Sequence, residues 1–352
     1  MGTTYGTAGN DTINVSTWSA TWSVYGYGGN DTITISNSSI SSVIISGGAD
    51  NDIINVPFAQ SASVHGDDGD DRITLDGATT AGARYIYGDG GKDEIKGSDS
   101  ADYIFGGSGN DTIWGRLGAD HIYGDDGNDT IIANMAYHPV FYDGGADQDT
   151  LLIYPSSSYF WYEVNIATMS GIERIENTDP GKLAYLVGNA LNLDDVTLID
   201  INGVKGNNGD NYLRAGESQY ASGNMLRMTL DGLGGNDALR GAANPDLLIG
   251  GAGNDRLDGF GGNDELNGGT GSDQFHFYEG WDVDTIKDFT QGEDLIYLHK
   301  TGLVDISSIN LTIQNDSDLN IKIGSIEFLI ENGASMTLTD SDFVFTETIP
   351  YI

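Results

Sequence analysis

Aspartates recur every nine residues through the middle of the chain, in a setting suited to binding a cation. Each is preceded by glycines and followed by one residue and an isoleucine: Asp93, Asp102, Asp111, Asp120 and Asp129. Glycines permit the positive φ of a tight turn and leave its carbonyl oxygens uncovered, while the aspartate adds an anionic oxygen. Calcium takes about six to eight oxygen ligands, more than one such turn supplies. Two turns stacked one coil apart can supply them, so the spacing predicts calcium between successive coils.

The residues after each aspartate predict the strands that would position these turns. An x-Ile-x segment fits a three-residue strand whose central side chain points inward. In a flattened parallel coil such strands would bury a stack of isoleucines. The predicted stack is Ile95, Ile104, Ile113, Ile122 and Ile131.

The same pattern continues on both sides of this block. Upstream, aspartates follow Gly/Asp turns about one coil apart, and we name the edge that carries them edge A. The opposite edge, edge B, is rich in Ser and Thr except at Asp102 and Asp120, where calcium is predicted on both edges. A second block follows downstream, after residues 163–230, which lack a clean repeat and carry Asn211 at the aspartate position. The predicted metal ligands are Asp11, Asp31, Asp52, Asp71, Asp93, Asp102, Asp111, Asp120, Asp129, Asp149, Asp237, Asp246, Asp255, Asp264 and Asp273.

The cleanest copy of the repeat, residues 106–113, reads GGSGNDTI and matches the nonapeptide G-G-x-G-x-D-x-U-x, in which U is apolar. The chain therefore resembles the RTX family of secreted calcium-binding repeat proteins. This resemblance implies an all-β fold, a right-handed parallel β-roll or β-helix solenoid stabilised by several Ca²⁺ ions. The tail from Phe275 resembles the cap of serralysin-type proteins, and residues 342–349 resemble an uncleaved export signal for the type I secretion machinery.

Four segments are predicted from these changes in pattern. Residues 1–162 form an N-terminal β-helix with calcium nonapeptides, and residues 163–230 form irregular, calcium-poor coils or, alternatively, a separate small domain. Residues 231–274 form a second calcium β-roll block. Residues 275–352 form the C-terminal cap and secretion signal, because a solenoid must cover its last apolar coil.

Composition supports a secreted, calcium-bound protein. Asp and Glu number 53 against 15 Lys and Arg, a formal charge of −38 that bound cations would neutralise. The same charge argues against nucleic acid, whose phosphates need basic partners. Cysteine is absent, so calcium must do the cross-linking that disulfides do elsewhere. The N-terminus has no apolar signal region and no run is long enough for membrane insertion, so we expect export through the C-terminal signal.

Known catalytic motifs are absent, so any activity must reside on the coil itself. The histidines form no H-E-x-x-H and no G-x-S-x-G is present. RTX relatives include polysaccharide-acting enzymes, and parallel β-helices host many polysaccharide lyases, which is an analogy at the level of fold. Extracellular polysaccharide is therefore the predicted partner.

A lyase site is predicted on edge B, where the calcium turns give way to aromatic residues. Counting nine residues from edge A places His138 in line with Asp102 and Asp120. Cleavage of a uronate polymer by β-elimination needs a base, a proton donor and a cation against the carboxylate. The predicted catalytic residues are Tyr137, His138 and Arg84, and the predicted substrate-binding residues are Tyr142, Tyr159, Trp161 and Lys182.

Other interpretations of the same residues remain open. Tyr137 and His138 could form a turn that packs beneath the loop of Tyr159. A glycoside hydrolase would need two carboxylates about 5–10 Å apart, and the chain offers many candidates. A non-catalytic role, as a calcium-binding adhesin, matrix or surface-layer protein, requires nothing beyond the repeat.

Overall fold

The computed structural model consists of two compact units, residues 1–182 and 183–352. It describes residues 1–17, 20–57, 61–75, 84–133, 138–154, 161–179, 182–193, 196–216, 218–219, 226–278, 282–299, 309–314 and 317–346. Strands dominate both units, and no α-helix occurs among the described residues. Among the described residues, no helix is long and apolar enough to cross a membrane.

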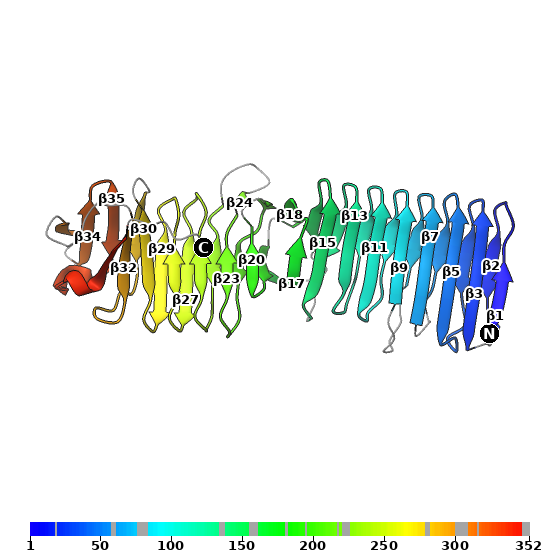
Figure 1. Cartoon of the computed structure of the whole chain (residues 1–352), viewed down its shortest axis with the longest axis horizontal. Helices are drawn as coiled ribbons and strands as arrows, with labels where there is room; N and C mark the ends of the chain where they lie inside the picture. The colour runs from blue at the N-terminus through cyan, green and yellow to red at the C-terminus, as the bar shows by residue number, and fades with distance from the viewer. Residues whose placement is uncertain are drawn as a thin grey trace. The chain divides into compact units, whose positions relative to one another are not determined.

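Unit 1 is a parallel β-solenoid in which each coil contributes one strand to each of two sheets (Figure 1). The longer strands, which end at edge A, are β1 (Gly2–Tyr5), β3 (Thr21–Gly28), β5 (Ser42–Ala49), β7 (Ser61–Asp68), β9 (Arg84–Gly90), β11 (Asp102–Ser108), β13 (His121–Asp126), β15 (Val140–Ala146) and β17 (Trp161–Ser170). The shorter strands, which begin at edge A, are β2 (Thr12–Val15), β4 (Thr32–Ile35), β6 (Ile53–Asn55), β8 (Arg72–Thr74), β10 (Glu94–Lys96), β12 (Thr112–Trp114), β14 (Thr130–Ala133), β16 (Thr150–Ile153) and β18 (Arg174–Asn177).

The five predicted isoleucines lie in the core of unit 1, in one row on each of its two sheets. Ile95 pairs with Ile113, and Ile113 with Ile131, across β10, β12 and β14. Ile104 pairs with Ile122 across β11 and β13. All five side chains are at most 1% exposed, because every second residue of a strand points to the same face. The prediction of an all-β parallel solenoid with this core is confirmed.

Unit 2 repeats the two-sheet arrangement. One sheet contains β19 (Leu183–Val187), β22 (Gly203–Lys205), β25 (Thr229–Asp231), β27 (Leu247–Ala252), β29 (Glu265–Thr270) and β31 (Val283–Ile286). The other contains β20 (Ala190–Asn192), β23 (Tyr212–Arg214), β26 (Ala238–Arg240), β28 (Arg256–Asp258), β30 (Gln274–Tyr278), β32 (Leu295–His299) and β36 (Phe343–Thr346). Two short strands, β21 (Thr197–Ile199) and β24 (Ser218–Gln219), pair with each other. Part of the predicted calcium-poor segment therefore forms parallel coils.

The C-terminal residues cover the end of the last coil. Strand β31 pairs in parallel with β35 (Ile326–Ile330). Antiparallel pairing continues from β35 to β34 (Asp318–Ile323) and to β33 (Asn310–Gln314). Two 3-10 turns, η2 (Gly333–Ser335) and η3 (Asp340–Asp342), lead into β36. The change from parallel to antiparallel pairing fits a cap, which needs no further coil to stack upon.

Adjacent residues of β6 allow a direct test of which face is buried. Ile54 is fully buried, whereas its neighbour Ile53 is 44% exposed. We expect Ile54→Ala to lower the free energy of unfolding by about 2–5 kcal/mol, because it opens a cavity in the core. Ile53→Ala removes the same atoms from a side chain that is already 44% exposed, so it should lower the free energy of unfolding far less. Urea unfolding in calcium checks both, and equal losses would contradict the arrangement.

Candidate functional site

The edge-A aspartates form a column of hydrogen bonds between successive coils. The backbone N–H of Asp93 donates to Oδ1 of Asp111 at 2.7 Å, and that of Asp111 donates to Oδ1 of Asp129 at 2.7 Å. The same bond joins Asp11 to Asp31, and each later aspartate of the column to the next, as far as Asp149. One carboxylate oxygen of each aspartate from Asp31 onward is thereby used to stack the coils.

The second oxygen of most of these carboxylates is buried without a hydrogen-bond donor. The aspartates whose Oδ2 has this property are Asp31, Asp52, Asp71, Asp93, Asp111, Asp129, Asp149, Asp237, Asp255, Asp264 and Asp273. Buried polar atoms are almost always paired, so repeated unpaired carboxylate oxygens are the donor set expected of a cation site. Calcium, which binds oxygen ligands, suits this donor set.

Glycine at the start of each turn lets oxygens from two coils converge. A Cβ built on Gly88 would lie 2.3 Å from Oδ2 of Asp93 and 2.3 Å from the carbonyl oxygen of Gly106, one coil further. Any side chain would therefore fill the space beside the unpaired carboxylate oxygen. The calcium prediction fits this geometry at the turns where the oxygen is unpaired.

The electrostatics of the columns also favour a bound cation. Burial raises the pKa of Asp93 to about 7; the hydrogen bond from Asp71 opposes the shift, and the negative charge of Asp111 adds to it. Burial likewise raises the pKa of Asp71 and of Asp129 to about 7. A divalent ion bound between the coils would favour the charged carboxylates and remove the repulsion along the column.

Three acidic residues that the sequence analysis missed extend the columns. Oε2 of Glu173 accepts the N–H of Asp149 at 2.8 Å, and Oδ1 of Asp294 accepts the N–H of Asp273 at 2.9 Å. Oδ1 of Asp284 accepts the N–H of Asp264 at 3.0 Å. Asp284 and Asp294 are each followed by one residue and Ile, the same signal as in the repeats, but each keeps only one of the three glycines, Gly280 and Gly292 respectively.

At Asp11 and Asp246 the second oxygen already has a donor. Oδ2 of Asp11 accepts from the N–H and the hydroxyl of Thr7. The two oxygens of Asp246 accept the N–H groups of Met228 and Ala242 at 3.0 and 2.8 Å. These two turns therefore offer less to a calcium ion than the sequence analysis predicts.

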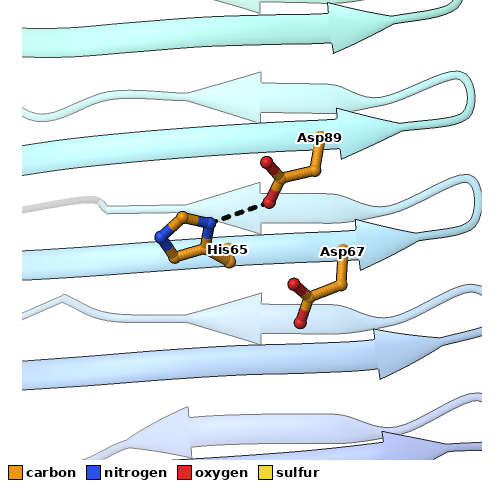
Figure 2. A group of neighbouring side chains, drawn as sticks. All are labelled: His65, Asp67 and Asp89. Atoms are coloured by element: carbon orange, nitrogen blue, oxygen red, sulfur yellow. Dashed lines mark hydrogen bonds and ion pairs between the residues drawn. The ribbon is translucent and has the colours of Figure 1, made fainter.

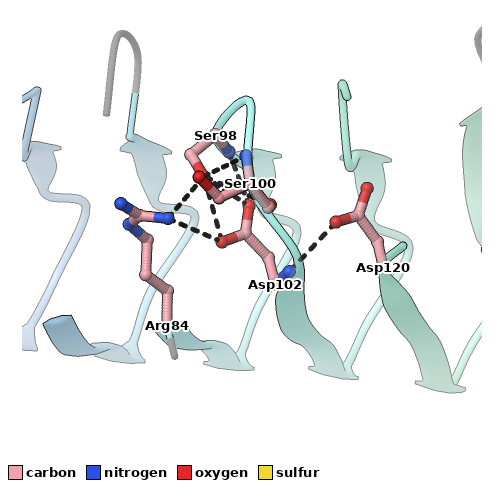
Figure 3. A network of polar contacts seen from close by, with 5 residues as sticks. All are labelled: Arg84, Ser98, Ser100, Asp102 and Asp120. Atoms are coloured by element: carbon pink, nitrogen blue, oxygen red, sulfur yellow. Dashed lines mark hydrogen bonds and ion pairs between the residues drawn. The ribbon is translucent and has the colours of Figure 1, made fainter. Parts of the chain in front are cut away.

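On edge B, Arg84 supplies the positive charge that calcium was predicted to supply at Asp102. Arg84 occupies the position paired with Asp102 in the neighbouring strand, and neither side chain is exposed. Its Nη1 donates to Oγ of Ser98 at 2.9 Å and lies 3.6 Å from Oδ1 of Asp102 (Figure 3). Ser98 donates its N–H and its hydroxyl to Oδ2 of Asp102 at 2.6 and 2.9 Å. The prediction that Arg84 binds a polymer carboxylate is wrong, because a buried guanidinium cannot reach one.

Asp120 follows Asp102 in the same edge-B column. Its Oδ1 accepts the N–H of Asp102 at 3.0 Å. Burial raises the pKa of Asp120 to about 8, and the charge of Asp102 adds to the shift. A cation at this turn would relieve that cost, so calcium at Asp120 stays a prediction.

A histidine and two aspartates form a separate group beside edge A (Figure 2). Ligand atoms of His65, Asp67 and Asp89 all lie within 4.8 Å of one another. Nδ1 of His65 is 2.8 Å from Oδ2 of Asp89, and Ser46 donates its hydroxyl to Asp67. Because these contacts join successive coils, we interpret the group as a polar link between them.

His138 lies in the wall of a pocket of about 450 Å³ on edge B. Asp99 and Ser100 come from the turn before Asp102, and Leu117 from the turn before Asp120. Arg116 pairs with Asp99, with Nη2 and Oδ1 3.0 Å apart. The register differs from the predicted one: Phe141 pairs with His121, so Val140 and not His138 follows Asp120 in line. The pocket is nevertheless lined by both an imidazole and one carboxylate of an ion pair.

Of the other predicted site residues, those that the structure describes do not gather at this pocket. Tyr142 is 2% exposed and belongs to the core, so its predicted role in binding substrate is wrong. Nζ of Lys182 pairs with Oδ2 of Asp179 at 3.2 Å, and Lys182 does not line the pocket. Tyr137 and Tyr159 lie outside the described residues, as does the side chain of Trp161, whose backbone begins β17. Their roles stay predictions.

Aromatic side chains on the outer face of β9, β11, β13 and β15 stack on one another. The rings of Tyr87 and Phe105 are 5.0 Å apart and nearly parallel, and those of Phe105 and Tyr123 are 4.8 Å apart. A second column runs through Tyr85, Tyr103 and His121. The faces of these rings contact each other within the columns, so the stacking stabilises the coil. Little ring face is left exposed on which a sugar could stack.

Comparison with known proteins identifies the repeats. Residues 42–56, 80–113, 87–121, 106–134 and 240–275 match the family of the RTX calcium-binding nonapeptide repeat (4 copies). No protein of curated function matches the chain in sequence.

Two solved structures resemble parts of the chain. The AlgE6R3 subunit of the mannuronan C5-epimerase from Azotobacter vinelandii is 23% identical over 44% of this chain and 80% of that one, with a TM-score of 0.28. The extracellular lipase LipA from Serratia marcescens is 20% identical over 72% of this chain and 40% of that one, with a TM-score of 0.25. At these TM-scores neither likeness bears on function.

Replacement of one carboxylate at each kind of turn tests the assignment of calcium. Asp111 has an unpaired Oδ2, whereas both oxygens of Asp246 accept N–H groups. We expect Asp111→Asn to lower the amount of calcium bound per chain, because it removes the anionic ligand and keeps the Oδ1 acceptor. Asp246→Asn should leave that amount unchanged. Equilibrium dialysis measures both, and equal losses would contradict the distinction.

Removal of the buried guanidinium tests the role of Arg84. We expect Arg84→Met to lower the free energy of unfolding by about 3–5 kcal/mol, because Asp102 would remain buried without its cation. Arg72→Met is the matched control, since Arg72 pairs with Glu94 at 3.4 Å and its side chain is 61% exposed. Such surface pairs contribute about 0–1 kcal/mol. Denaturant unfolding in calcium compares the two variants, and a small loss for Arg84→Met would contradict its role.

Proposed function

We propose that this chain, an RTX calcium-binding nonapeptide-repeat protein, is extracellular and folds when it binds calcium. In this proposal it acts on an acidic polysaccharide at the edge-B pocket. The observation that supports this function best is that His138 lines the same pocket as Asp99, whose carboxylate pairs with Arg116. A pocket of about 450 Å³ has room for more than one sugar ring.

The chemistry proposed for the pocket is β-elimination. His138 would remove the proton on C5 of a uronate residue, and the electrons of that bond would form a double bond to C4. The bond from C4 to the bridging oxygen then breaks, and Tyr137 would protonate the leaving oxygen. Arg116, which replaces Arg84 in this scheme, would offset the negative charge that develops at the uronate carboxylate.

The extracellular location follows from what the fold would need. Many carboxylates have a buried, unpaired oxygen that calcium would satisfy, and calcium is abundant outside cells and scarce in cytosol. The aspartates would supply the anionic ligands and the glycines keep the space open, so that a bound calcium ion would cross-link successive coils. Export by the type I secretion machinery through residues 342–349 is part of the proposal.

A non-catalytic role as an adhesin, matrix or surface-layer protein is the second candidate. It gains support from the burial of Arg84 and Tyr142, two residues that the lyase interpretation had used. It also gains support from the stacked aromatic columns, which serve the coil itself. Such a protein would bind a polymer without cleaving it.

The lyase mechanism predicts that one histidine is essential and another is not. We expect His138→Ala to lower the rate of uronate-polymer cleavage by about 10²–10⁴-fold, because the base is lost. His121→Ala, in the aromatic column, should retain the rate. The absorbance of the unsaturated uronate product measures the rate, and circular dichroism in calcium confirms that both variants fold.

Two outcomes separate the candidates. Cleavage that persists in His138→Ala would exclude this pocket as the active site. The unchanged protein could instead bind the polymer and release neither an unsaturated product nor new reducing ends. That result would contradict the enzymatic function and favour the non-catalytic role.

A further inference from the structure

The polar link of His65, Asp67 and Asp89 has the composition of a metal site that is separate from the calcium turns. His65 and Asp67 are two residues apart on β7, so both side chains lie on the outer face of that strand. Asp89 pairs with Asp67 in the neighbouring strand, β9. Strand period and register therefore bring an imidazole and two carboxylates together on one face of one sheet (Figure 2).

The ligand atoms of the group are close enough to share one ion. One atom from each of the three side chains lies within 4.8 Å of the other two. Ligands that share a tetrahedral Zn²⁺ ion at about 2.0–2.2 Å lie about 3.4 Å from one another, so small side-chain rotations would suffice. The side chains of His65 and Asp89 are 36% and 38% exposed, which leaves the ion a path from solvent.

Neighbouring side chains hold two of these ligands in place. The ring of His65 stacks on the ring of Tyr87, with the ring centres 4.4 Å apart and the planes within 6° of each other. Ser46 of β5 donates its hydroxyl to the carboxylate of Asp67. Contacts of this kind, one shell outside a metal, fix the orientation of the ligands. Both partners belong to strands adjacent to β7, so the sheet itself sets the geometry of the group.

A divalent ion also suits the charge of the group. Asp67 and Asp89 stand directly opposite each other, and like charges in that position destabilise a sheet. A doubly charged ion bound between them turns this repulsion into attraction. The imidazole nitrogen decides which ion is favoured, because calcium and magnesium prefer oxygen ligands, whereas imidazole suits zinc and other transition metals.

The same sheet shows that the histidine is what distinguishes this position. Asp125 of β13 lies in the same row as Asp89, two strands further along, and has a similar left-handed φ of 73°. Tyr123 stands two residues before Asp125, where β7 has His65. An aspartate in this row is therefore part of the repeat, and only the imidazole of β7 adds a nitrogen ligand beside it.

We propose that His65, Asp67 and Asp89 bind one divalent transition-metal ion, such as Zn²⁺. The ion joins β7 to β9 on the outside of the coil. Three protein ligands on a four-coordinate ion leave one position for water, which another ligand can replace. The site goes beyond the function proposed above, because it lies beside edge A and does not depend on cleavage at His138.

Binding of Zn²⁺ by the full chain in excess calcium tests the proposal, because the calcium keeps the repeat turns occupied. Equilibrium dialysis measures the zinc bound per chain and its dissociation constant, and we expect one tight site. Loss of an outer-shell partner alone costs about 10–100-fold in metal affinity. We therefore expect His65→Ala, and likewise Asp89→Asn, to raise the dissociation constant for Zn²⁺ at least about 10-fold.

Two matched variants keep the proposed site intact. His121→Ala removes an imidazole that stacks on Tyr103 in the same sheet, and Asp125→Asn removes the carboxylate of the equivalent row. Each should leave the dissociation constant unchanged, and circular dichroism in calcium establishes that each variant folds. The proposal is overturned by a lack of zinc binding in excess calcium, by an unchanged dissociation constant in His65→Ala and Asp89→Asn, or by an equal loss in His121→Ala.

Discussion

The structure depends on a single hydrogen bond that is repeated from coil to coil, in which the N–H of one aspartate donates to Oδ1 of the next. This bond sets the register of the stack, because it ties each turn to the turn above it. It also uses only one of the two carboxylate oxygens. The other oxygen is left buried and anionic, so the feature that stacks the coils makes the stack dependent on a cation.

The two edges of unit 1 meet this requirement in different ways. Edge A repeats a glycine turn that leaves the carboxylate oxygen open, whereas edge B at Asp102 uses Arg84 and Ser98. A turn whose buried carboxylate is paired with other side chains no longer needs the glycines of the repeat. We infer that this freedom is what lets edge B carry the pocket of His138.

Much of the fold could be predicted from the sequence because the repeat fixes both spacing and burial. Ile113 was placed correctly by its distance from Asp111 alone. His138 was misplaced because counting nine residues ignores the longer segment that leads to Val140. Arg84 was misjudged because its charge suggested an exposed side chain, whereas its position opposite Asp102 buries it. Tyr142 was misjudged by its aromatic character, although its spacing from Val140 puts both on the inner face. The pairing of Arg214 with Arg240 in neighbouring strands could not be predicted, because residues 26 apart meet only once the coil lengths are known.

Calcium titration of the metal-free full chain tests the central claim most directly. With excess chelator the aspartate columns would repel and leave buried charges uncompensated, so we predict a coil-like far-ultraviolet circular dichroism spectrum. Addition of calcium should restore the β spectrum cooperatively, and magnesium at the same concentration should not, because it demands a smaller and more rigid octahedral shell. A full β spectrum in excess chelator would contradict the account.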